Sequence, residues 1–102
     1  MYIIVTSTYP NNKAKEVADM FLKVMTKYPP DINLGTPVVP AAIRTTLQGV
    51  KTLNISEIKK GKLEEALAFA SKRLAMFDDI EGYRYTVKTY MNLEEAMQTI
   101  GA

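Results

Sequence analysis

Two segments in which apolar and polar side chains alternate constrain the fold most strongly. Residues 50–58 read VKTLNISEI and residues 83–88 read YRYTVK. In the first segment Leu53 and Ile55 alternate with Thr52, Asn54 and Ser56, and in the second Tyr83, Tyr85 and Val87 alternate with Arg84, Thr86 and Lys88. Because successive side chains of a strand point to opposite faces, both segments are predicted to be strands with one apolar face and one polar face. An antiparallel sheet that helices cover on one side has this pattern.

Two other segments have the period of an amphipathic helix, and they are predicted over residues 12–27 and 62–78. Their apolar residues recur three and four positions apart, so each helix has one apolar stripe. The stripes consist of Val17, Met20, Phe21, Val24, Met25 and Tyr28, and of Leu63, Ala66, Leu67, Ala70, Leu74 and Phe77. After Asn92, the sequence Leu93-Glu94-Glu95 resembles a capping box and predicts a short C-terminal helix that ends at Gly101.

The remaining strands are predicted over residues 2–8 and 41–47, with an irregular connection over residues 28–40. Pro40 precedes the second strand and places it at a sheet edge, because proline cannot donate to the ladder. The resulting order is βαββαβ with a short terminal helix. We therefore predict one α+β domain over residues 1–102. It is a ferredoxin-like fold with a four-stranded antiparallel sheet and two helices on one face.

The composition excludes several classes of function. The chain contains no cysteine and no histidine, which removes disulfides, thiolate nucleophiles and zinc sites of the Cys/His type. The net charge of +2 is too small to indicate a nucleic-acid-binding surface. No apolar run approaches the roughly 20 residues of a membrane helix, and Met1 leads directly into a strand-like run without a signal peptide. We expect a cytoplasmic protein without a metal or cofactor, and without a nucleic-acid or membrane partner.

The polar face of the predicted sheet is the candidate site. If the helices cover the face that carries Leu53, Ile55, Tyr83, Tyr85 and Val87, the other face collects cations among hydroxyl and amide groups. Arginine and hydroxyl groups suit carboxylate or phosphate oxygens. The predicted ligand-binding residues are Arg44, Thr52, Asn54, Arg84, Lys88 and Tyr90.

The element order, the length and the short C-terminal helix together resemble a subunit of the dimeric α+β-barrel superfamily of ferredoxin-like domains. The resemblance covers the whole chain and rests on architecture. It implies that two sheets pack together in a homodimer whose interior can serve as a binding or catalytic pocket. Enzymatic members often use histidine, asparagine or tryptophan, and this chain contains neither histidine nor tryptophan.

Three functions are compatible with these observations. The first is a homodimer that binds a small anionic or carbonyl-containing metabolite in a cavity on the polar sheet face. The second is a cofactor-independent enzyme, similar to an oxygenase or isomerase, that uses the same cavity. Its acid–base groups would come from Tyr83, Tyr85, Tyr90, Lys88 or the acidic segment 78–81. The third is a structural dimer whose polar face only contacts solvent or the partner.

Overall fold

The computed structural model describes residues 1–101 and shows an α+β chain with one four-stranded antiparallel sheet and three α-helices. This level of the predicted fold is confirmed. The elements in chain order are β1 (Tyr2–Tyr9), α1 (Ala14–Lys27), β2 (Gly35–Thr46), β3 (Gly49–Ile58), α2 (Leu63–Ala75), β4 (Arg84–Tyr90) and α3 (Leu93–Thr99). A 3₁₀ turn, η1 (Asn11–Lys13), precedes α1.

The strands lie in the order β2-β3-β1-β4. The first and third strands are therefore central, and β2 and β4 form the edges. This confirms the edge position that Pro40 predicts for the second strand. Register shifts in the β2–β3 ladder fall between Pro37 and Val39 and between Val39 and Ala42, so the proline-containing part of β2 pairs irregularly. A residue without an N–H group is tolerated at such a place.

The connection predicted over residues 28–40 is shorter in the structure, because β2 begins at Gly35 and not near residue 41. The prolines of this segment suggested irregular structure, yet an edge strand needs donors on only one side. The amide of Lys59 donates to the carbonyl of Leu34, with N and O 2.9 Å apart, and holds the start of β2 beside the end of β3.

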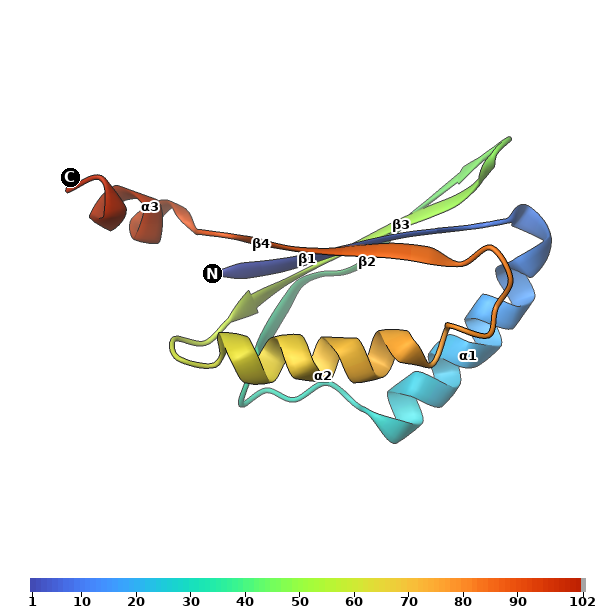
Figure 1. Ribbon diagram of the computed structural model, residues 1–102, viewed down its shortest axis with the longest axis horizontal. Helices are drawn as coiled ribbons and strands as arrows, with labels where there is room; N and C mark the ends of the chain where they lie inside the picture. The colour runs from blue at the N-terminus through green and yellow to red at the C-terminus, as the bar shows by residue number, and fades with distance from the viewer. Residues whose placement is uncertain (102) are drawn as a thin grey trace.

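Both long helices lie on the same side of the sheet, and no helix lies over the opposite side (Figure 1). Two groups of buried side chains join this helix layer to the sheet. The larger group contains Tyr9, Val17, Val24, Val50, Phe77 and Ile80. The smaller group, at the other end of the sheet, contains Ile3, Ile58 and Ala66. Burial of these side chains is the main force that holds the helices in place.

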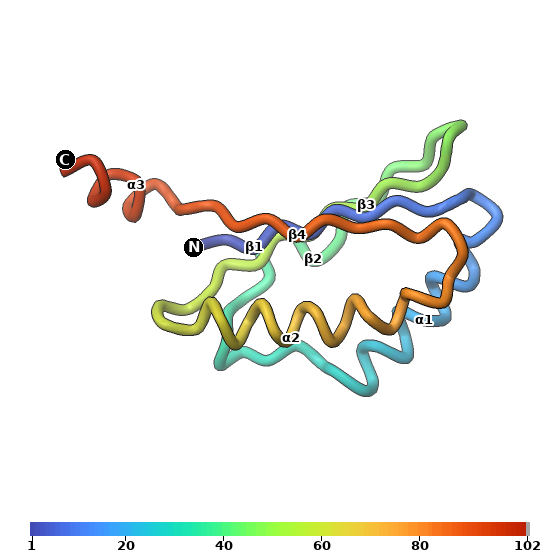
Figure 2. Tube along the Cα trace, viewed as in Figure 1, coloured from blue at the N-terminus to red at the C-terminus, as the bar shows by residue number. Residues whose placement is uncertain are grey.

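The two ends of the molecule project beyond this body. In the Cα trace, α3 continues outward from β4, and the β2–β3 hairpin extends past the sheet at the opposite end (Figure 2). The predicted capping box of α3 is confirmed, since the Asn92 side chain accepts a hydrogen bond from the Glu95 amide, and the Glu95 carboxylate accepts one from the Asn92 amide. Glu95 also forms an ion pair with the N-terminal ammonium group of Met1. No residue of α3 is buried.

Candidate functional site

The sheet side without helices, which we call the open face, is built in cross-strand rows. Side chains that are paired across neighbouring strands point to the same face. At one end, Arg44 pairs with Lys51, Lys51 with Thr8, and Thr8 with Arg84. We call these four residues the cation row, because it carries three positive charges from three strands. All four side chains are exposed.

The rest of the open face becomes first apolar and then acidic and aromatic. The two middle rows carry Ala42, Leu53, Thr6 and Thr86, and then Val39, Ile55, Ile4 and Lys88. The far row carries Thr36, Glu57, Tyr2 and Tyr90. A hydrogen bond joins the hydroxyl groups of Thr6 and Thr86 in the centre. Three of the four cations of this face thus lie at one end, the carboxylate of Glu57 lies at the other end, and Lys88 lies in the row next to Glu57.

No cation of the open face has an ion-pair partner among residues 1–101, where the ion pairs are Met1–Glu95, Lys13–Glu16 and Lys62–Glu65. Two unit charges about 5 Å apart repel by roughly 0.8 kcal/mol in water, but by about 3 kcal/mol at an effective dielectric constant of 20. The cation row is therefore tolerable while water covers it. A surface that excluded this water would require compensating negative charge.

The structure brings together only part of the predicted set of six site residues. Arg44 and Arg84 share the cation row, whereas Lys88 lies two rows and Tyr90 three rows away on β4. Six residues of a strand span about 20 Å, so one small ligand cannot contact Arg84 and Tyr90 of the same chain. Lys51, which the predicted set omits, takes the central position of the cation row.

The other two predicted site residues, Thr52 and Asn54, lie on the helix side of the sheet, so their assignment to the open face is wrong. Thr52 pairs with Ser7 and Asn54 with Val5, on the side where Ser7 is buried. The related expectation for Leu53 and Ile55 is also wrong, because both lie on the open face. Tyr85 and Val87 lie on the helix side, as predicted.

The orientation of β3 follows from the two ends of the strand and not from its middle. Val50 and Ile58 are 5% and 9% exposed, and the helices bury them in the two core groups. With a period of two, the residues between them on the same side are Thr52, Asn54 and Ser56. The hydroxyl groups of Ser7 and Thr52 hydrogen-bond to each other, which satisfies the polar atoms of this inner strip. Val50 and Ile58, the apolar residues at the two ends of the strand, were therefore the sequence signal for the orientation of β3.

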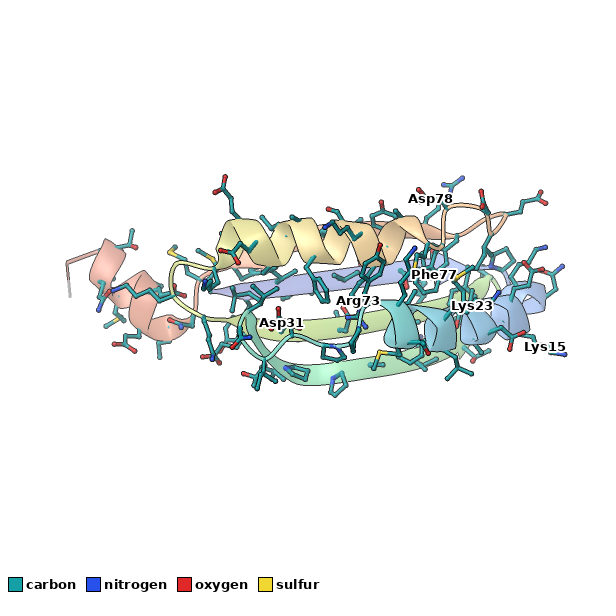
Figure 3. The ribbon with its side chains drawn as sticks, turned by 90° about the horizontal axis from the view of Figure 1, so that it is seen from below. Lys15, Lys23, Asp31, Arg73, Phe77 and Asp78 are labelled. Carbon is teal, nitrogen blue, oxygen red and sulfur yellow. The ribbon has the colours of Figure 1, made fainter. Side chains whose placement is uncertain are left out.

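Arg73 of α2 is a partly buried cation without a carboxylate partner among residues 1–101. Its Nη2 lies 3.0 Å from Sδ of Met25, and its guanidinium group lies over the Phe69 ring, 5.8 Å from the centroid. Its Nε is buried and has no hydrogen-bond partner within the described chain. Burial lowers the pKa of Arg73 from its ordinary value. Figure 3 shows Arg73 between α2 and the C-terminal end of α1, away from the open face.

The tyrosine proposed as an acid–base group in the turn before β4 belongs to the core. The Tyr83 ring stacks on Phe77 at 4.7 Å and on Tyr9 at 6.0 Å between centroids. Desolvation raises the pKa of the Tyr83 hydroxyl above its ordinary value, and the hydrogen bond with Ser7 only partly opposes this shift. A raised pKa keeps the phenol protonated at neutral pH, so Tyr83 is poorly suited to act as a base.

The acidic segment 78–81 also carries no site. Asp78, Asp79 and Glu81 are exposed in the turn after α2, while Ile80 is buried. Within residues 1–101, no cluster of acidic side chains is large enough to hold a metal ion. Two shallow hollows lie along α1, one beside Thr26 and Met76 and the other beside Asp19 and Ile80. The predicted cavity therefore requires a second surface over the open face.

Comparison with the models of known protein families gave no match, and a search of curated proteins found no similar sequence. None of the helices in the described part of the chain has the length and apolar character needed to cross a membrane.

Proposed function

We propose that this chain is a ferredoxin-like subunit that forms a homodimer through its open face and binds a small anionic or carbonyl-containing metabolite between the two sheets. The observation that carries the proposal is the cation row. Arg44, Lys51 and Arg84 share one line across an uncovered sheet face without ion-pair partners.

The centre of the open face supports the first part of the proposal. Ile4, Leu53 and Ile55 lie on neighbouring strands there and are only partly covered. Each fully buried side chain of this kind gains about 1.5–3 kcal/mol, so a partner over this patch would be stabilised by several of them. A second copy would bring the same apolar patch to the contact, as an isologous interface requires.

The charge of the enclosed face supports the second part. The cation row contributes three positive charges, and the far row contributes one carboxylate, that of Glu57. Two charges per chain therefore remain uncompensated before Lys88 is counted. Anionic groups such as phosphate or a dicarboxylate match this excess, and the guanidinium groups of Arg44 and Arg84 can donate in pairs to their oxygens.

A thermal-shift screen of carboxylates, phosphates and acyl thioesters tests the ligand. A ligand that binds only the native state at ten times its Kd adds about 1.4 kcal/mol, which should raise the Tm by several degrees. Arg84→Ala should abolish this shift. Lys15→Ala removes the same charge from the outer side of α1, far from the open face, and should leave it intact (Figure 3).

The result that would overturn the proposal is also clear. If no anion stabilises the protein, and Arg84→Ala leaves or raises its stability, the cation row is only a solvated surface. Light scattering at micromolar concentration gives the state of association independently. A monomer mass at every concentration would remove both the dimer and the enclosed cavity.

A further inference from the structure

We infer that the second copy lies antiparallel on the open face, and that α3 of each chain docks on the β2–β3 hairpin of the other. This inference rests on the proposed homodimer and specifies its orientation and its outer contacts. Three observations carry it: the charge pattern of the open face, the exposed apolar stripe of α3, and the positions of α3 and the hairpin at opposite ends.

The charge pattern selects one of the two ways in which identical sheets stack face to face. When the two-fold axis runs along the strands, each cation row faces the partner's cation row, and six positive charges meet. When the axis runs across the strands, each cation row faces the partner's far row. Each strand then lies over its own copy, so Lys51 faces Glu57 of the partner subunit, and Arg84 faces Tyr90 of the partner subunit. The second arrangement pairs opposite charges and is the favoured one.

The helix α3 has an apolar stripe that its own chain leaves uncovered. Leu93, Met97 and Ile100 are 78%, 43% and 75% exposed, and they lie on one side at i, i+4 and i+7. Its other side is fixed to the body by the ion pair between Glu95 and Met1. A helix of seven residues is too short to be stable without packing, so a partner surface over this stripe would stabilise it.

The β2–β3 hairpin offers a matching apolar tip at the opposite end of the molecule. Leu47 in its turn is 95% exposed. The long axis of the molecule measures 49 Å, and α3 and the hairpin occupy its two ends. Both project to the side of the sheet that faces away from α1 and α2 (Figure 1). Reversal of one copy end to end therefore brings each α3 to the end of the partner at which the hairpin lies.

Cysteine cross-linking tests this orientation directly, because the natural chain has no cysteine. Chains with Leu47→Cys and chains with Leu93→Cys are refolded together and oxidised at low concentration. We expect mixed Leu47→Cys/Leu93→Cys disulfides in clear excess over both homodisulfides. Chains with Leu22→Cys, exposed on α1, serve as the matched control and should show no preference for the Leu93→Cys chain.

The same experiment separates the failure of this inference from the failure of the dimer. A dimer mass by light scattering without an excess of mixed disulfide refutes the docking of α3 and leaves the dimer standing. An excess of Leu47→Cys homodisulfide indicates sheets with like ends together and also refutes the inference. A monomer mass refutes both. As a second measurement, Leu93→Asp should weaken dimerisation at least tenfold without lowering the stability of the single chain.

Discussion

Replacement of Val24 by alanine tests which side of α1 packs against the sheet. Val24 is 2% exposed and packs in the larger core group with Tyr9, Val50 and Phe77. Two methyl groups are lost, at about 0.8 kcal/mol each. The cavity that remains adds about 1 kcal/mol, and the better helix propensity of alanine returns about 0.5 kcal/mol. We expect a net destabilisation of about 2 kcal/mol.

The neighbouring Leu22 provides a matched control on the same helix. It is 65% exposed, so Leu22→Ala should change the free energy of unfolding by no more than about 0.5 kcal/mol. Urea unfolding followed by far-ultraviolet circular dichroism measures both variants. They are compared with the natural chain at one protein concentration, because association would shift the midpoint.

The reasoning is refuted if the two substitutions have similar costs, or if Leu22→Ala is the more damaging one. Either result would mean that α1 packs through a different side. The assignment of Val24 to the larger core group would then lose its basis.

Three further predictions concern particular groups. Ser7→Ala should cost about 1 kcal/mol in urea unfolding because it leaves the Thr52 hydroxyl without its partner, and adding Thr52→Val should recover most of this cost. The pKa of Tyr83 is raised, so the stability that its neutral phenol contributes is fully present below pH 10.0 and is lost as the pH rises through the folded-state pKa. Tyr83→Phe should therefore reduce the fall of Tm at alkaline pH. The pKa of Glu95 is lowered, first by its bond to the N-terminal ammonium group and then by the Asn92 amide. The anchoring of α3 by Glu95 should therefore persist above pH 4.5 and be lost as the pH falls through the folded-state pKa of Glu95. The amide resonances of α3 should report this transition, and Glu95→Gln should remove it.

The types of several elements were predictable because their segments keep a single period. The stripe from Val17 to Tyr28 fits only a helix, and the alternation in residues 83–88 fits only a strand. The edge position of β2 followed from Pro40. These signals are local, so the sequence contains them in full.

The orientation of β3 was not predictable from its middle residues, because both of its faces contain apolar side chains. Leu53 and Ile55 lie on one face, and Val50 and Ile58 lie on the other. The pairing of Ser7 with Thr52 decides between the two, and this register depends on contacts between segments that are far apart in the sequence. The same error excluded Lys51 from the candidate site and placed Thr52 and Asn54 in it.

The position of α3 was likewise not predictable from the sequence. Its stripe of Leu93, Met97 and Ile100 has the pattern of a helix that packs on its own domain. In the structure the chain continues outward from β4, and the stripe stays exposed. Only the three-dimensional arrangement shows that residues 1–101 leave this stripe exposed.

The dependence of dimerisation on inorganic phosphate tests the central claim most directly, because it links the partner and the anion in one quantity. Sedimentation equilibrium of the natural chain is measured at constant ionic strength, with phosphate or with chloride alone. If an anion is held between two cation-bearing open faces, phosphate must tighten the dimer, and Arg84→Ala must remove this response. A monomer in both buffers, or a dimer that is equally tight with and without phosphate, would contradict the account.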